Sequence, residues 1–186
     1  MIRLGYILCG SFCTFEKSIA LMKRLVNKYE IVPIMSQTAY STDTKFGKAS
    51  EIVAEVENLT GKKVISTIVG SEPLGPKKML DAVLVAPCTG NTVGKIANGI
   101  TDTSATMAVK SCLRVGIPVL LCVCTNDALS GSFVNIAKLM NSKNIYLAPM
   151  VQDDPVNKPN SLVTNFEKVE ESLLLALKGI QMQPVF

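Results

Sequence analysis

Short apolar runs rich in β-branched residues recur along this chain, with room for a helix between most of them. They cover residues 2–9, 31–35, 64–69, 82–86, 117–124 and 145–148. Within each run the apolar residues are nearly continuous instead of alternating with polar ones. A strand that is covered on both faces has this pattern. The runs therefore predict a parallel sheet of about six strands.

Several segments between the runs carry apolar side chains at spacings of three and four, which is typical of a helix with one buried face. The stripes are Phe15, Ile19, Met22 and Val26; Phe46, Ala49, Val53 and Val56; Ala105, Ala108, Cys112 and Val115; and Leu162, Phe166, Val169, Leu173 and Leu177. Alternation of strands and helices predicts an α/β fold, a three-layer, doubly wound, Rossmann-like parallel sheet with helices on both faces. No linker or repeat interrupts it, so we expect a single domain over residues 1–186.

The C-terminal part is predicted to contain a loop and a final helix. Residues 151–161, VQDDPVNKPNS, contain two prolines and many polar side chains, which favours a surface loop. The last apolar stripe predicts a helix over residues 162–179.

Composition narrows the functional classes. The chain is 48% hydrophobic, has a net charge of +4 without a run of like charges, and has no Trp, so a nucleic-acid or membrane surface is not indicated. No apolar run is long enough to span a membrane, and the N-terminus favours a first strand over a signal peptide. We therefore expect a cytoplasmic protein.

The chain contains no histidine, which excludes imidazole acid–base chemistry and His-ligated zinc. Six cysteines are present without a CxxC pair, and most lie in apolar runs, where a free thiol behaves as a small hydrophobe. Cys122 and Cys124 would share one face of a strand. A metal site there is an alternative, but we expect core thiols and no metal.

In doubly wound folds, ligands bind at the carboxyl ends of the strands. Gly10, Ser11 and Phe12 follow the first predicted strand and precede a helix, whose free N–H groups favour an anion. Ser36 follows the second strand and could complete a phosphate cup. The alternatives are that Ser11 or Thr14 caps the helix, and that Ser36 belongs to an ordinary turn.

The segment APCTGNTVGKIANGITD, residues 86–102, follows the fourth apolar run. Pro87 is expected to end the strand, and Gly90 allows close approach of the backbone. Small, polar, uncharged groups suit the edge of a planar heterocycle, so a pocket lined by Pro87, Cys88, Thr89, Asn91 and Thr92 is predicted. An ordinary turn with a capped helix is the alternative.

Candidates for direct chemistry are few. Asn91 and Lys95 are predicted to contact an anionic substrate, although Lys95 could equally be a surface lysine. Asp127 is one of few carboxylates that follow a strand, so it is a candidate acid or base. It could instead cap the next helix, as could Ser132. Asn91 and Asp127 are the only catalytic candidates, and no acid or base is assigned.

Three segments resemble a known family: GSFCTFEK after the first strand, Ser36, and APCTGNTVGKIANGITD. They are similar to motifs of the flavoprotein family of FMN-containing cysteine decarboxylases and flavin prenyltransferases, over roughly residues 1–150. The last segment resembles that family's Pro-Ala-Ser-Ala-Asn-Thr motif and its continuation. The matching positions are Pro87, Asn91, Thr92, Lys95, Ala97, Gly99 and Asp102.

The resemblance implies an FMN cofactor. It implies that Gly10, Ser11, Phe12 and Ser36 hold the phosphate, and that the loop beginning at Pro87 approaches the flavin and the substrate. It also implies a homo-oligomer, a trimer or a multiple of one, in which a neighbouring copy of the chain completes the site.

The chain departs from the decarboxylases of that family at two points. It has no histidine, and CTNDALSG stands where those enzymes carry Pro-x-Met-Asn. A narrower likeness over the whole chain implies oxidation of a small dicarboxylate together with a second, different chain that holds the nicotinamide cofactor, NADP. A non-catalytic partner protein and a stand-alone flavin-dependent decarboxylase remain as alternatives, the latter disfavoured by both departures.

Overall fold

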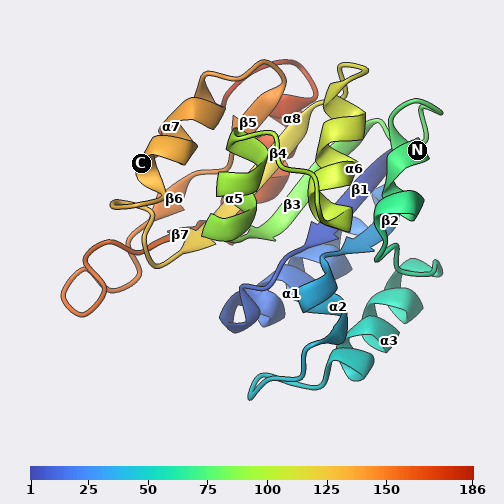
Figure 1. Cartoon of the computed structure of the whole chain (residues 1–186), viewed down its shortest axis with the longest axis horizontal. Helices are drawn as coiled ribbons and strands as arrows, with labels where there is room; N and C mark the ends of the chain where they lie inside the picture. The colour runs from blue at the N-terminus through green and yellow to red at the C-terminus, as the bar shows by residue number, and fades with distance from the viewer.

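The computed structural model describes residues 1–186 as a three-layer α/β fold (Figure 1). Seven strands form one sheet in the order β2-β1-β3-β4-β7-β6, and β5 also pairs with β4. The strands are β1 (Ile2–Leu8), β2 (Tyr29–Met35), β3 (Ala82–Cys88), β4 (Val119–Thr125), β5 (Ile145–Leu147), β6 (Met150–Val151) and β7 (Leu162–Thr164). Strands β1 to β5 pair in parallel. The predicted doubly wound sheet is therefore confirmed.

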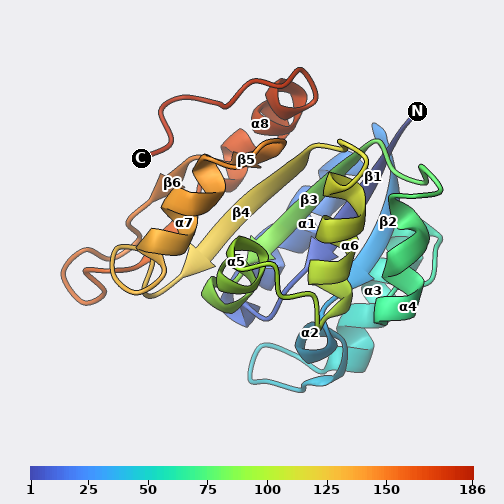
Figure 2. The same cartoon turned by 45° about the horizontal axis from the view of Figure 1, so that its top comes forward.

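Helices cover both faces of this sheet. They are α1 (Phe15–Leu25), α2 (Gln37–Ser41), α3 (Ala49–Thr60), α4 (Ile68–Ser71), α5 (Gly90–Ala97), α6 (Ser104–Leu113), α7 (Phe133–Met140) and α8 (Val169–Ala176). Three short 3-10 turns are added, at Phe12–Thr14, Glu72–Leu74 and Phe166–Lys168. Figure 2 shows α5, α6 and α7 in front of the strands and α1 behind them. None of the helices has a stretch long and apolar enough to cross a membrane.

The core is divided by the sheet into two apolar clusters. In β3, Val83 and Val85 face the cluster under α5, α6 and α7, whereas Leu84 faces the cluster under α1 and α8. All three side chains are fully buried. Successive side chains of a strand point to opposite faces, so a strand covered on both sides must be apolar throughout. This is why the runs of the sequence are continuous.

The strand predicted over residues 64–69 is wrong. Ile65 forms only an isolated parallel bridge with Ile34, and α4 begins three residues later. Thr67 caps that helix, because its Oγ1 accepts a hydrogen bond from the N–H of Gly70 at 3.1 Å. A local cap therefore ends the pairing after one bridge.

The helix predicted over residues 162–179 is wrong at its start. Leu162–Thr164 is β7, which pairs antiparallel with β4 and β6 and makes the sheet mixed. The hydroxyl of Thr164 donates to the carbonyl of Val123 at 3.0 Å, and α8 begins only at Val169. The helix predicted from Phe46 likewise begins later, at Ala49, whose N–H donates to the carboxylate of Asp43 at 2.8 Å.

Candidate functional site

A cleft of about 450 Å³ opens at the carboxyl ends of β1, β3 and β4. Its walls come from residues 10–14, from Thr89, from residues 124–126, and from the segment between Asp153 and Val163. The antiparallel strand β7 brings this last segment to the same edge, because Leu162 pairs with Thr125 at the end of β4. The volume lies within the range of small-molecule sites.

The loop after β1 leaves polar groups free to face a ligand. Ser11 and Thr14 precede helical turns, but neither side chain makes a cap hydrogen bond. Thr14 donates to the carbonyl of Ser11 at 2.8 Å, while the hydroxyl of Ser11 and the N–H of Gly10 have no partner within the chain. These two donors suit an anion such as the phosphate of a flavin nucleotide.

Ser36 lies outside the cleft and acts as a helix cap. It precedes α2, and its Oγ accepts a hydrogen bond from the N–H of Ala39 at 3.3 Å. A Cβ atom placed on Gly10 would lie 3.3 Å from a methyl carbon of Thr38, so the loops after β1 and β2 touch. Ser36 is therefore close to the first loop, and its part in holding a phosphate stays a prediction.

Pro87 does not end its strand. β3 continues to Cys88, and a register shift between Val85 and Cys88 takes up the missing N–H of the proline. The carbonyl of Pro87 accepts a hydrogen bond from the N–H of Cys9 at 3.2 Å. Both Pro87 and Cys88 are buried, so they lie beneath the cleft instead of lining it.

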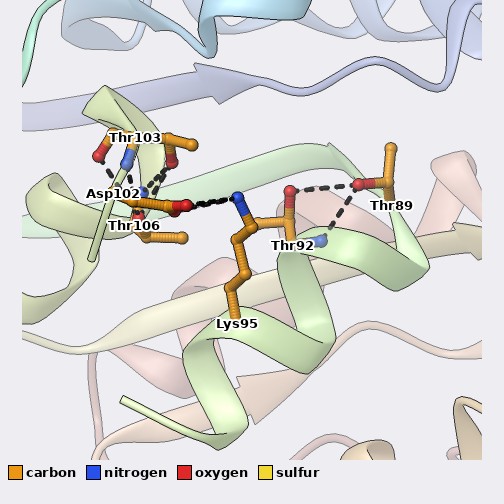
Figure 3. A network of polar contacts seen from close by, with 6 residues as sticks. All are labelled: Thr89, Thr92, Lys95, Asp102, Thr103 and Thr106. Carbon is orange, nitrogen blue, oxygen red and sulfur yellow. Dashed lines mark hydrogen bonds and ion pairs between the residues drawn. The ribbon is translucent and has the colours of Figure 1, made fainter. Parts of the chain in front are cut away.

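Thr89 joins the cleft to the start of α5. Its Oγ1 accepts a hydrogen bond from the N–H of Thr92 at 3.2 Å and donates to the hydroxyl of Thr92 at 3.0 Å (Figure 3). Thr89 lines the cleft, Thr92 is buried, and Asn91 is exposed outside the cleft with no side-chain hydrogen bond. The capped turn and the cleft wall are thus formed by the same residue.

Lys95 forms an ion pair that links α5 to the loop before α6. Its Nζ lies 2.8 and 2.9 Å from the two carboxylate oxygens of Asp102 (Figure 3). This hydrogen bond holds the pKa of Asp102 below its usual value. Asp102 directly precedes Thr103, which caps α6 in a reciprocal pair with Thr106. Lys95 does not line the cleft, so its contact with a substrate stays a prediction.

Asp127 is held by two hydroxyl groups. Thr125 donates to its Oδ1 at 2.6 Å, and the Oγ of Ser132 lies 2.9 Å from both carboxylate oxygens. These hydrogen bonds, that of Thr125 most of all, lower the pKa of Asp127 despite the opposing effect of burial. The carboxylate is therefore ionised at neutral pH. Asp127 adjoins the cleft residue Thr125 without lining the cleft itself.

Five of the six cysteines are buried, as expected from the apolar runs, and Cys13 is exposed. Burial raises the pKa of Cys9 and of Cys112 to about 11, so both thiols are protonated at neutral pH. Cys13 and Cys124 line the cleft.

Several cleft residues escape sequence reasoning. They are Lys17, Phe46, Asp153, Lys158 and Ser161. By sequence, Lys17 is an ordinary solvated position on a helix, and Lys158 is part of a polar surface loop. Only the pairing of β7 with β4 shows that this loop reaches the cleft.

Comparison with known proteins identifies the family. The Flavoprotein family model matches residues 1–169. The chain belongs to the Flavoprotein family. The B subunit of dipicolinate synthase from Bacillus subtilis (strain 168) is 42% identical over 184 residues, which cover 98% of this chain and 92% of that protein. The family resemblance seen over residues 1–150 is therefore confirmed.

Two solved structures of this fold extend the comparison. The crystal structure of the B subunit of dipicolinate synthase from Bacillus halodurans C superposes with a TM-score of 0.90 at 42% identity, over 99% of this chain and 95% of that one. DmrB of Burkholderia xenovorans, described as a cubic protein cage for redox transfer and solved in complex with FMN, gives a TM-score of 0.70 at 20% identity. That comparison covers 95% of this chain and 96% of DmrB.

Proposed function

We propose that this chain is the B subunit of a dipicolinate synthase. It acts with the A subunit of that enzyme, which holds NADP, to oxidise dihydrodipicolinate to dipicolinate during sporulation, in the cytoplasm of the mother cell. The observation that carries this proposal is the 42% identity to the B subunit of a dipicolinate synthase, which extends over nearly the whole of both chains.

Flavin binding is the contribution that the site supports best. The free hydroxyl of Ser11 and the free N–H of Gly10 would hold the phosphate of FMN, with Phe12 and Ser36 beside them. Thr89 would face the ring, supported by Pro87, Cys88 and Thr92. Bound FMN would supply the electron transfer, while the protein supplies position and electrostatics.

Substrate contacts are proposed at Asn91 and Lys95, and Asp127 is the carboxylate available as a base. Asn91 is exposed and its amide has no partner in the chain, so it can face a ligand or a neighbouring copy of the chain. Asp127 is ionised at neutral pH, which suits a proton acceptor and not a proton donor.

A homo-oligomer, a trimer or a multiple of one, is part of this proposal. The candidate cleft is open, and in the family resembled by this sequence a neighbouring copy completes the flavin site. A solved relative of the same fold is itself described as a cubic cage.

The first test is a titration of the purified chain with FMN, followed by flavin fluorescence and absorbance. We expect saturable binding, which Ser11→Ala and Asn91→Ala each weaken. The contrary result is no binding of FMN up to millimolar concentration.

That contrary result would favour a second function, a non-catalytic partner that stabilises the A subunit or channels its intermediate. The absence of histidine from the chain favours this alternative, because no imidazole is available for proton transfer. A purified complex of both subunits that is active yet free of flavin would establish it.

A further inference from the structure

We propose that Lys17 and Lys158 together bind one negatively charged group, a carboxylate or a phosphate, inside the cleft. This inference rests on the proposed function and deepens it, since it names the residues that recognise the charge of the ligand. Lys158 lies outside the segments that carry the family resemblance, and Lys17 is the last residue of one of them, GSFCTFEK.

The charged lining of the cleft consists of three residues, Lys17, Asp153 and Lys158. Two cations against one carboxylate give this lining a net positive charge. Lys17 lies in the first turn of α1, and Lys158 lies in the loop before β7. An anion in the cleft is therefore attracted from two separate elements of the fold.

Lys17 has no carboxylate partner. Each of the ion pairs in the structure involves other residues. On the same helix, Lys23 is paired with Glu55 at 2.9 Å and Arg24 with Glu167 at 2.8 Å. The one basic residue of α1 that lines the cleft is thus the one whose charge is left uncompensated.

Lys158 has a partner that a ligand can replace. Its Nζ lies 3.3 Å from Oδ2 of Asp153, and about half of the lysine side chain is exposed. A long, exposed pair of this kind contributes little stability. An anionic ligand can therefore replace Asp153 as the partner of the Lys158 ammonium group at a small cost in free energy.

The loop holds Lys158 in place through its own hydrogen bonds. The N–H of Lys158 donates to the carbonyl of Asp154 at 2.8 Å, and its carbonyl accepts from the N–H of Ser161 at 3.0 Å. The side chain of Gln152 donates to the carbonyl of Pro159 at 2.8 Å. The lysine is thus presented by a folded loop, which lowers the entropic cost of binding.

Uncharged hydrogen-bond donors also line the cleft beside the two lysines. Ser11 and Ser161 both line the cleft, and the hydroxyl of Ser11 has no partner in the chain. Lys95 does not contribute to this lining, because it lies outside the cleft, where it binds both oxygens of Asp102. The positive charge that lines the cleft thus comes from the unpaired Lys17 and from Lys158, whose pairing with Asp153 is weak.

Calorimetric titration of the full chain tests this assignment with three probes: FMN, riboflavin and pyridine-2,6-dicarboxylate. We expect Lys17→Gln and Lys158→Gln each to weaken binding of an anionic probe about tenfold, as for the loss of a charge-assisted hydrogen bond. Lys168→Gln is the matched control, because Lys168 lies outside the cleft, pairs with Glu171 at 3.1 Å, and is 50% exposed against 51% for Lys158. The control should bind all probes as the wild type does.

The probes distinguish the two sources of charge. Weaker binding of FMN with unchanged binding of riboflavin assigns the lysines to the cofactor phosphate. Weaker binding of pyridine-2,6-dicarboxylate alone assigns them to a substrate carboxylate. Asp153→Asn should strengthen binding of the probe that the lysine variants weaken, since it removes the carboxylate partner of Lys158. Glu171→Gln should leave the binding of every probe unchanged.

The inference is overturned if both lysine variants bind every probe as the wild type does, or if Lys168→Gln weakens binding equally. In those cases the wild type still binds a probe, and the proposed function stands. If the wild type binds none of the three probes, the proposed function fails, and this inference fails with it.

Discussion

Gly90, the first residue of α5, packs closely against the loop after β4. A Cβ atom added there would lie 2.6 Å from the hydroxyl of Thr125, 2.8 Å from that of Ser132 and 3.0 Å from Oδ1 of Asp127. The hydroxyls of Thr125 and Ser132 both bind Oδ1 of Asp127, so neither can move away without breaking a hydrogen bond. The small residue predicted from close backbone approach is thus required by a polar cluster instead of by a ligand.

Gly90→Ala is therefore expected to destabilise the protein. Overpacking of a filled site costs about 1–3 kcal/mol, so the thermal midpoint should fall and FMN binding should weaken through displacement of Thr89. Gly94→Ala in the same helix is the control, because its Cβ would meet only the amide of Asn135 at 3.5 Å. A helical alanine there should be neutral or stabilising. Equal melting curves for the two variants would contradict the argument.

At the scale of elements, Arg3 and Asp81 fasten the beginning of β1 to the beginning of β3. The guanidinium donates to both carboxylate oxygens, at 3.1 and 2.6 Å, and the N–H of Arg3 donates to Oδ2 at 2.8 Å. The hydrogen bond from Arg3 is the main reason that the pKa of Asp81 is lowered. The pair fixes the central strands at the end of the sheet opposite the cleft.

This contact predicts a pH dependence of stability. Because the pKa of Asp81 is lower in the folded protein, the stabilisation is present above the unfolded value of about 3.9 and is lost as the pH falls through the folded value. Asp81→Asn should lower the thermal midpoint by about 2–4 °C at pH 7, allowing for partial solvent screening. Calorimetry at successively lower pH should show the difference shrink as the carboxylate of Asp81 becomes protonated. A difference that is unchanged at low pH would rule out the ion pair as its cause.

The sequence predicts the central strands well, because continuous apolar runs report burial on both faces. Prediction from the sequence fails where the secondary structure of a segment depends on hydrogen bonds to a distant part of the chain. Ile65 has a strand-like sequence but only one bridge to make, and residues 162–164 fit a helical stripe until β4 and β6 offer them hydrogen bonds. Helical spacing cannot reveal such a partner.

In the candidate site, too, some residues can be predicted from the sequence and others cannot. Residues 10–14 and Thr89 are foreseeable, because they directly follow predicted strands. Lys158 is not foreseeable, since its position beside the cleft depends on the antiparallel pairing of β7 with β4. The network around Asp127 is foreseeable only in part: Ser132 is a natural cap by its position, yet its hydroxyl binds the carboxylate of Asp127 instead of the backbone of α7.

At the scale of the whole molecule, an oligomer is the expected state. Sedimentation velocity of the purified 20.0 kDa chain should show a species of three copies or a multiple of three. The physical reason is the open cleft, which a neighbouring copy would complete, and addition of FMN should shift any dissociation towards the assembled form. A monomer at micromolar concentration, with and without FMN, would contradict this expectation.

The cleft combines segments that are far apart along the chain. Residues 10–14 form one wall, and the segment from Asp153 to Val163 forms another. A ribosome makes the chain from its N-terminus, and folding begins before synthesis is complete. The early strands can therefore assemble while the site still lacks its last wall. A nascent or prematurely terminated chain can thus acquire most of the sheet while its cleft still lacks the wall formed by the segment from Asp153 to Val163.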